Sequence, residues 1–283
     1  MPFVRVGDLD VAYDALGPED APAVLMINGL GADRTAWRLQ TPALGARYRT
    51  IVYDNRDVGQ TGPGNRPGTY GIGRFAADAA GLLDALGIGR AHVVGASMGG
   101  AIAQEFALAH PDRAASLTVV CSWPRTDPWL AELLAQWERL FAAMGGLEWA
   151  RTSWLWVFTH RYYADPANLP VLMDGVEAYP YPQSAASYGR QSRAAIGHDA
   201  RDRLPGIRLP THVIAGAEDL LTPLRFSAEI AAAIPGARLS VIEAVGHGMF
   251  WEATERFNDL VLGFLDEVSL GVAEPQEGER RCG

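Results

Sequence analysis

The fold is indicated above all by one stretch, AHVVGASMGG, at residues 91–100. Its first residues are apolar, which predicts a short buried strand, and a helical pattern of apolar residues follows it. Between the two, Gly95 and Gly99 lie two positions on either side of Ser97. Glycines at this spacing let a strand turn abruptly into a helix and leave the central side chain exposed on strained backbone. The stretch therefore predicts a nucleophile elbow, with Ser97 as the nucleophile.

A serine nucleophile needs a base and an orienting acid, because its hydroxyl is a weak nucleophile at its own pKa. The predicted base is His247, which lies between two glycines after an apolar strand pattern at residues 239–242. The predicted acid is Asp219, which follows an earlier strand pattern, and its neighbour Glu218 is the alternative. The order of serine, acid and histidine along the chain is that of the α/β-hydrolase arrangement.

An acyl-transfer site also needs backbone donors for the oxyanion of its tetrahedral intermediate. One predicted donor is the N–H of Met98, directly after the candidate nucleophile. The second is the N–H of Leu30, in the loop NGLG at residues 28–31, which follows an early apolar strand pattern. Glycines on both sides of Leu30 would let the backbone approach a substrate oxygen closely. We therefore expect Leu30 and Met98 to form an oxyanion hole.

Composition limits the classes of partner that the protein can have. The chain has 283 residues and a formal net charge of -9, with no basic cluster that could offset it. This charge disfavours nucleic acids and anionic membranes as partners. The sequence also has no signal-peptide pattern and no apolar run long enough to span a bilayer. We expect a cytoplasmic protein that acts on a small molecule, and the sequence leaves its oligomeric state open.

The cysteines and histidines give no indication of a metal site. The two cysteines, Cys121 and Cys282, provide neither a disulfide framework nor the spacing of metal ligands. Apart from His247, the histidines do not pair at metal-ligand spacing, and structural or surface roles are expected for them. The predicted chemistry therefore requires no metal and no cofactor.

Strand and helix patterns alternate along most of the chain. Polar and apolar residues alternate at 3–13, which predicts an opening hairpin, and residues 74–86 have the spacing of an amphipathic helix. Buried strands are predicted at 23–27, 50–53, 91–94, 116–120, 209–215 and 239–242. This alternation predicts an α/β fold with a mostly parallel central sheet flanked by helices. The candidate site residues follow the ends of these strands, where ligands bind in open α/β sheets.

The alternation stops between residues 122 and 203, where a stretch rich in Trp and Tyr predicts an inserted helical lid. The chain would then divide into a core at 1–121 and 204–268, a lid (cap) at 122–203 and a disordered tail at 269–283. Most of the aromatic residues are expected to pack helix against helix, but their density also favours an apolar pocket between lid and core. The predicted pocket residues are Trp154, Trp156, Met249 and Phe250.

Several of these motifs together resemble the α/β-hydrolase fold superfamily. They are NGLGAD, VYDNRDVGQT, GASMGG, GAEDLLTP and GHGMFWE, and the resemblance covers residues 3–268. The pattern is most similar to the group of 3-oxoadipate enol-lactonases, cofactor-free haloperoxidase-like esterases and aclacinomycin-methylesterase-like proteins. Asn28 stands where many members have His, and Thr61 and Arg56-Asp57 also depart from the common pattern. Because the oxyanion donor is a backbone amide, we expect Asn28 to retune the loop without abolishing catalysis.

The resulting prediction is a serine hydrolase of the esterase or lactonase type, which cleaves a carboxylic ester or lactone through an acyl-enzyme. The same Ser-His-Asp triad can also carry out cofactor-free perhydrolysis of the haloperoxidase type, C–C bond hydrolysis or thioester cleavage. A ligand receptor without catalytic turnover is the alternative from another class. An aspartate-nucleophile dehalogenase or epoxide hydrolase is disfavoured because residue 97 is serine.

Overall fold

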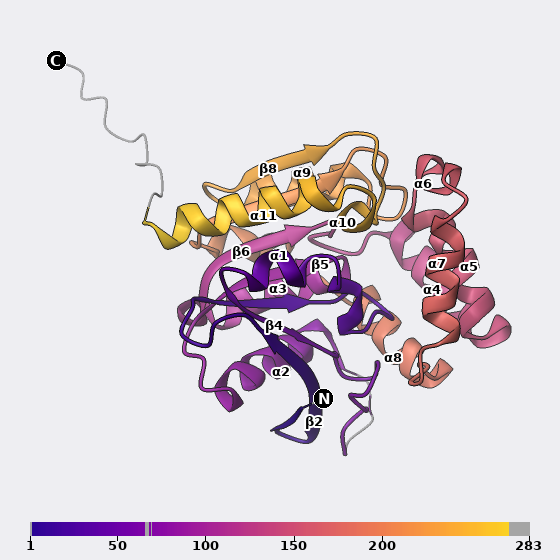
Figure 1. Cartoon of the computed structure of the whole chain (residues 1–283), viewed down its shortest axis with the longest axis horizontal. Helices are drawn as coiled ribbons and strands as arrows, with labels where there is room; N and C mark the ends of the chain where they lie inside the picture. The colour runs from indigo at the N-terminus through magenta and orange to yellow at the C-terminus, as the bar shows by residue number, and fades with distance from the viewer. Residues whose placement is uncertain (1, 66–67, 69, 272–283) are drawn as a thin grey trace.

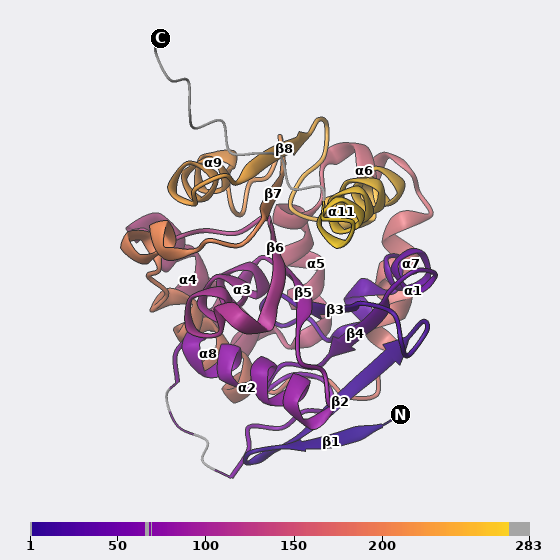
Figure 2. The ribbon, with the colours of Figure 1, turned by 90° about the vertical axis from the view of Figure 1, so that its left-hand side faces the viewer.

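The computed structural model describes residues 2–65, 68 and 70–271. Its centre is an eight-stranded sheet with the order β1-β2-β4-β3-β5-β6-β7-β8 (Figure 2). The strands are β1 (Phe3–Val6), β2 (Leu9–Leu16), β3 (Ala23–Ile27), β4 (Arg49–Tyr53), β5 (Ala91–Ala96), β6 (Ala114–Val120), β7 (Thr211–Gly216) and β8 (Arg238–Ile242). Strands β1 and β2 form an antiparallel hairpin, and β2 pairs antiparallel with β4. The pairs from β4 to β8 are parallel.

The predicted α/β fold is confirmed. Each of the six predicted buried strands is present, with its ends shifted by at most two residues. The helices outside the insertion are α1 (Thr41–Gly45), α2 (Ile72–Ala85), α3 (Met98–Ala109), α9 (Leu224–Ala233), α10 (Met249–Glu252) and α11 (Thr254–Ser269). Helix α2 corresponds to the helix predicted at 74–86.

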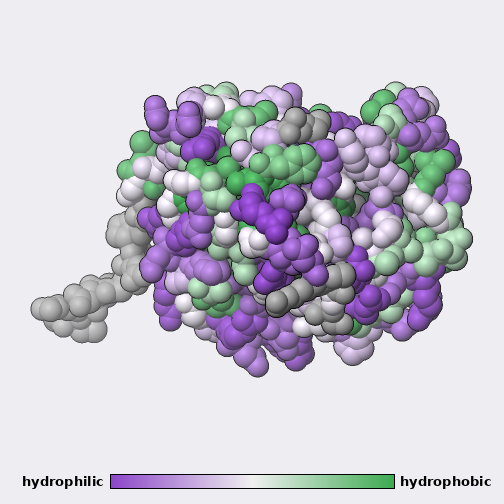
Figure 3. Space-filling view, turned by 90° about the horizontal axis from the view of Figure 1, so that it is seen from below, coloured by the Kyte–Doolittle hydropathy of each residue, from purple (hydrophilic) through white to green (hydrophobic). Residues whose placement is uncertain are grey.

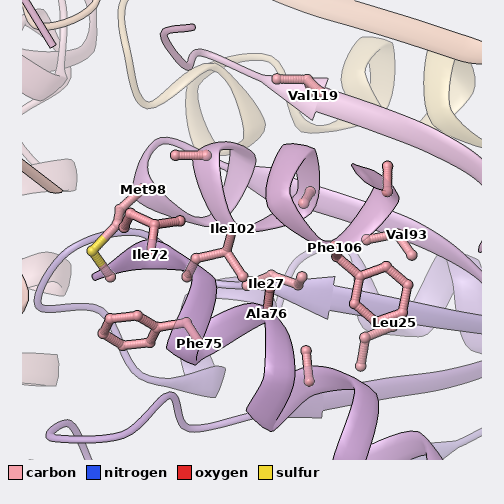
Figure 4. Close-up of a cluster of buried hydrophobic side chains, with 14 of the residues drawn as sticks. Leu25, Ile27, Ile72, Phe75, Ala76, Val93, Met98, Ile102, Phe106 and Val119 are labelled. Carbon is pink, nitrogen blue, oxygen red and sulfur yellow. The ribbon is translucent and has the colours of Figure 1, made fainter. Parts of the chain in front are cut away.

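Helices cover both faces of the sheet, and successive side chains of a strand point alternately to these two faces. In β3, Leu25 and Ile27 belong to a core cluster with α2 and α3 (Figure 4), and this cluster also includes residues of α9. Val24 and Met26 belong to a second cluster with α1 and α11. All the residues of β3 are buried, as expected for a parallel strand covered on both faces. The packing on both faces therefore fixes the positions of the strand ends.

Five helices are inserted between β6 and β7, and Figure 1 shows them at one end of the molecule. They are α4 (Pro128–Met144), α5 (Gly146–Val157), α6 (His160–Ala164), α7 (Asn168–Glu177) and α8 (Ala185–Ile196). The predicted helical insertion is thus confirmed, whereas the division at residues 122 and 203 stays a prediction. We call α4–α8 the lid.

Aromatic side chains hold the lid helices together. Trp149 of α5 packs edge-on against Trp137 of α4, with ring centroids 5.1 Å apart. Phe141 of α4 stacks on Tyr188 of α8 at 4.3 Å. Such pairs contribute about 0.5–1.5 kcal/mol beyond the area that they bury. These residues therefore pack helix against helix, as expected for most of the lid aromatics.

The surface and the chain ends complete the architecture. Within the described residues, no helix is long and apolar enough to cross a membrane. The face in Figure 3 mixes hydrophilic and hydrophobic residues, and hydrophobic side chains exposed on the lid include Leu155 and Val171. Helix α11 ends at Ser269, and residues 272–283 of the predicted disordered tail lie outside the described residues.

Candidate active site

Ser97 lies at the turn between β5 and α3, on strained backbone. Its dihedral angles are φ 58° and ψ −122°, a combination that costs a residue with a side chain about 1–3 kcal/mol. Two hydrogen bonds from the end of β6 hold it in place. The Ser97 N–H donates to the carbonyl of Val120 at 2.9 Å, and the Ser122 hydroxyl donates to the carbonyl of Ser97 at 2.8 Å. The local geometry is that of a nucleophile elbow, which presents the Ser97 side chain above the sheet.

The glycines beside Ser97 are required by close packing. A Cβ atom on Gly99 would lie 2.1 Å from the carbonyl oxygen of Ile27 in β3. A Cβ on Gly95 would lie 2.1 Å from the carbonyl oxygen of Gly99. Neither glycine has a positive φ angle. The spacing around Ser97 therefore reflects the approach of α3 to β3 and β5 and not backbone freedom at the glycines.

Asp219 and His247 are brought together from two loops at the carboxyl ends of β7 and β8. The Nδ1 atom of His247 lies 2.9 Å from Oδ2 of Asp219, and both residues are buried. The other carboxylate oxygen, Oδ1, accepts the backbone N–H groups of Leu221 and Thr222, each at 2.8 Å. The alternative acid, Glu218, is half-exposed and pairs instead with Arg161 at 2.7 Å. The hydrogen bond to His247 is thus made by Asp219.

Thr222 is a further member of this site that the sequence analysis did not identify. Its hydroxyl oxygen lies 2.9 Å from Asp219 Oδ2, 2.9 Å from the carbonyl oxygen of Cys121 and 3.1 Å from His247 Nδ1. The sequence contained a signal for it, because an aspartate side chain often accepts hydrogen bonds from the backbone N–H groups of the next few residues in a turn. That turn places the side chain of Thr222 beside the carboxylate.

The surroundings of His247 favour its protonated form. Burial by itself lowers the pKa of this imidazole, but the Asp219 carboxylate and, to a smaller extent, Cys121 raise it. The net result is a pKa well above its ordinary value. An imidazole that is stabilised when charged can accept a proton and hold it while a neighbouring group reacts.

Cys121 lies close to this pair. Its sulfur, a carboxylate oxygen of Asp219 and a ring nitrogen of His247 all lie within 4.8 Å of one another, a spacing that a metal ion could bridge. The hydrogen bond between Asp219 and His247 already uses two of the three groups. We therefore interpret the cluster as an acid–base pair with a buried thiol beside it.

Ser97, which follows β5, and His247, which follows β8, both lie near the carboxyl end of β6. The backbone of Ser97 is bonded to Val120 and Ser122, and the intervening residue, Cys121, is near His247. Among the described residues no hydrogen bond joins the hydroxyl of Ser97 to His247. In structures without substrate such bonds are often long and tighten only when the substrate is bound.

Two backbone donors lie beside Ser97. Helix α3 begins at Met98, and the loop at residues 28–31 lies against the elbow, since a Cβ on Gly29 would be 3.1 Å from that of Ser97. Within the described part of the chain, neither the N–H of Leu30 nor that of Met98 has a hydrogen-bond partner. Free N–H groups at this place can bind a negatively charged oxygen. The structure thus brings the two predicted oxyanion donors to the elbow.

The predicted pocket residues occupy different environments. A cavity of about 630 Å³ lies between the lid and the loops after β7 and β8, and its lining includes Trp156, Glu218 and Gly246. Trp154, Met249 and Phe250 are not among its lining residues, and neither is Ser97. Met249 is fully buried in the core cluster with α11, and the ring of Phe250 packs 5.0 Å from Trp37. The cavity therefore lies beside the acid–base pair.

The acidic residues after β4 are buried in ion pairs with partners on other segments. Asp54 binds Arg34 at 2.6 Å, and Asp57 binds Arg190 of the lid at 2.5 Å. Arg56, between them, binds Asp78 of α2 at 2.5 Å. Each pairing joins segments that are distant in sequence, and a local pattern cannot reveal such partners.

A serine elbow on a mostly parallel sheet, with helices on both faces, is the arrangement of the α/β-hydrolase class. Residues 22–254 match the family described as alpha/beta hydrolase fold, and the chain belongs to this family. The family resemblance is thus confirmed.

The individual relatives are hydrolases that are named for different activities. A protein from Azorhizobium caulinodans, named as a candidate carbamate hydrolase, RutD, is 33% identical over 95% of this chain and 99% of its own. An enol-lactonase from Burkholderia xenovorans is similar with a TM-score of 0.85 at 28% identity, over 94% of this chain and 100% of that one. A thermophilic esterase from Thermogutta terrifontis gives 0.79 at 26% identity, over 92% of this chain and 94% of that one. The likeness to enol-lactonases was predicted from the sequence, whereas the likeness to carbamate hydrolases was not.

Proposed function

We propose that the protein is a serine hydrolase that cleaves a carboxylic ester or lactone through an acyl-enzyme. The observation that carries this proposal is the hydrogen-bonded pair of His247 and Asp219 at the same end of the sheet as the strained elbow of Ser97. A base with an orienting acid is what a serine hydroxyl needs in order to attack a carbonyl group.

In the proposed mechanism, His247 takes the proton of the Ser97 hydroxyl through Nε2 as the oxygen attacks the substrate carbonyl. The N–H groups of Leu30 and Met98 hold the resulting oxyanion. The protonated His247 then gives its proton to the leaving alkoxide, and it next removes a proton from the water that hydrolyses the acyl-enzyme. Asp219 keeps the ring in the required tautomer and stabilises the imidazolium.

The relatives support an acyl-transfer reaction but name three kinds of substrate. An enol-lactone and a carboxylic ester both present a carbonyl group with an oxygen leaving group, in agreement with the proposed activity. Hydrolysis of a carbamate is the second candidate, favoured by the relative that is 33% identical to this chain. Attack on a carbamate carbonyl would use the same serine, base and oxyanion donors.

The proposal includes a place for the apolar part of the substrate. The cavity beside the lid has mostly apolar and aromatic lining, including Leu155, Trp156 and Phe158. Apolar walls with a few polar groups are typical of small-molecule sites. We assign this cavity to the acyl or alcohol group, with Trp156 as the predicted contact that lines it.

The experiment that tests the proposal is steady-state hydrolysis of p-nitrophenyl esters of increasing chain length by wild-type protein and Ser97→Ala. We expect turnover by the wild type and its loss in the variant. Enol-lactone and carbamate substrates, tested in parallel, rank the three substrate classes by kcat/KM. Equal turnover in the two proteins would contradict the role of Ser97 as nucleophile. No turnover by folded wild type on all three classes would contradict the proposed activity and favour C–C hydrolysis, perhydrolysis or a receptor role.

A further inference from the structure

Helix α8 of the lid is hydrogen-bonded to the loop that carries Leu30. Gln191 of α8 is fully buried, and its two amide atoms bind different loops of the core. Its Oε1 accepts the backbone N–H of Gly31 at 3.0 Å, and its Nε2 donates to the carbonyl of Arg56 at 2.7 Å. A single side chain of the lid thus connects the loop after β3 with the loop after β4.

Neighbouring contacts fix the side chain of Gln191. Arg190 binds the buried carboxylate of Asp57 through two nitrogens, with Nε 2.9 Å from Oδ2. Gln183 donates to the carbonyl of Asp57 at 2.6 Å and to Oε1 of Gln191 at 3.2 Å. Two-nitrogen binding of a carboxylate by arginine fixes direction as well as distance. Helix α8 is therefore docked on the core at one defined position.

Gly31 is restricted from the other side as well. Its φ angle is +72°, and a Cβ at this position would lie 3.1 Å from the ring of Tyr188, which is also on α8. The N–H of Leu30 and the N–H of Gly31 lie in the two peptide planes on either side of Leu30, which are joined by the φ and ψ angles of that residue. Once the Gly31 N–H is fixed, these two angles alone set the direction of the free Leu30 N–H, so its direction is restricted.

We propose that Gln191 is a positioning residue, which holds the Leu30 N–H in the direction required for the oxyanion. This inference rests on the acyl-transfer function proposed above. The adjacent Ser192 provides a contrast, because its hydroxyl donates to the carbonyl of Leu134 within the lid, at 3.0 Å. Ser192 stabilises the lid alone, whereas Gln191 connects the lid to the oxyanion loop.

The test compares Gln191→Met with Ser192→Ala on the best p-nitrophenyl ester. Methionine keeps the length and flexibility of the side chain but removes its hydrogen bonds to Gly31, Arg56 and Gln183. Ser192→Ala removes one buried hydrogen bond from the same helix without changing any contact of the oxyanion loop. Each variant is assayed for kcat, KM, thermal stability and the Ki of phenylboronic acid, whose tetrahedral adduct with serine places an oxygen in the oxyanion hole.

We expect Gln191→Met to lower kcat by about 10- to 100-fold with KM within about twofold, because loss or misplacement of an oxyanion donor slows the chemical step. The Ki of phenylboronic acid should rise by a similar factor. Ser192→Ala should keep both kcat and the Ki of phenylboronic acid within about twofold of wild type, even if it lowers the melting temperature as much as Gln191→Met does. If Gln191→Met does not fold, Gln191→Asn, whose amide is one methylene too short to reach both loops, is expected to show the same pattern.

A kcat of Gln191→Met within twofold of Ser192→Ala would overturn the inference, and so would a lower kcat with an unchanged boronic acid Ki. Turnover that persists in Ser97→Ala would contradict the proposed function instead. The two failures are therefore distinguishable.

Discussion

Replacing Asp219 with Asn should nearly abolish turnover while leaving the fold intact. The Oδ1 atom of Asp219 accepts two backbone N–H groups, from Leu221 and Thr222, each at 2.8 Å. Those two donors require an oxygen, so the carbonyl of the new amide must take the Oδ1 position. Its NH2 group then takes the Oδ2 position, which faces Nδ1 of His247.

This orientation puts a donor where His247 needs an acceptor. The Nδ1 atom of His247 must then accept a hydrogen bond, which leaves the proton of the neutral ring on Nε2. A ring with its proton on Nε2 cannot take the proton of Ser97. We therefore expect kcat to fall by about 10⁴-fold, equivalent to about 5 kcal/mol of lost transition-state stabilisation.

The pH dependence of kcat/KM tests the same reasoning independently. The proposed base acts as the neutral ring, so kcat/KM should fall as the pH drops below the pKa of His247. In the wild type this pKa is raised, mainly by the Asp219 carboxylate, so the loss begins above pH 6.5. In Asp219→Asn the carboxylate is absent and burial, which lowers the pKa, remains. The acidic limb should then move to lower pH.

The matched control is Glu218→Gln, which neutralises the adjacent carboxylate. Glu218 is half-exposed and lines the cavity assigned to the substrate, so this variant is expected to change KM. Its carboxylate binds Arg161 and not His247, so kcat should stay within about twofold of wild type. We would measure kcat and the far-UV circular dichroism of each purified variant. The circular dichroism separates a loss of activity from unfolding. Near wild-type kcat in Asp219→Asn, or a large loss in Glu218→Gln, would refute the assignment of the acid.

Three further predictions concern stability and are tested by chemical denaturation. Ser97→Gly should be more stable than Ser97→Ala by about 1 kcal/mol, because glycine tolerates φ 58°, and equal stability would argue against strain at the elbow. Gly99→Ala should destabilise the protein by more than about 2 kcal/mol, because its Cβ would lie 2.1 Å from a carbonyl oxygen. The control Gly73→Ala, which has open space around its Cβ, should not destabilise the protein. Burial lowers the pKa of three histidines to about 4, so the free energy of unfolding should decrease as the pH falls from 6.5 towards 4, by up to about 3 kcal/mol for each. These histidines are His92, His198 and His212. A free energy of unfolding that stays constant between pH 6.5 and pH 4 would show that they are not buried in the neutral form.

The fold could be predicted from the sequence because the strands of the parallel sheet are short, mainly apolar segments bounded by polar or glycine-rich turns. A strand covered on both faces forms a continuous apolar run in the sequence, and β3, AVLMI, is of this kind. The strand boundaries were predicted less accurately. Strand β6 starts at Ala114, two residues before the predicted start, although Ala114 is buried.

The members of the candidate site were predictable to different degrees. Ser97, Asp219 and His247 each follow a strand within a few residues, so a local motif identified them. The pocket was harder to predict, because an aromatic residue in the core and one lining a cavity look alike in sequence. Phe250, for example, packs against Trp37 and Phe257. The ion pair of Arg56 with Asp78 has no local signal in the sequence, because Asp78 lies on another element.

Gln191 shows why contacts between the lid and the core are inaccessible to motif reasoning. It is 160 positions from Gly31, and it lies on a helix in which polar and apolar residues are mixed. A glutamine in such a helix reads as a solvent-exposed residue. Only the fold shows that it is buried, and a buried amide must find hydrogen-bond partners. Because those partners are in the core loops, a change of lid sequence that alters substrate choice can also alter the rate of the chemical step, through the direction of one backbone N–H.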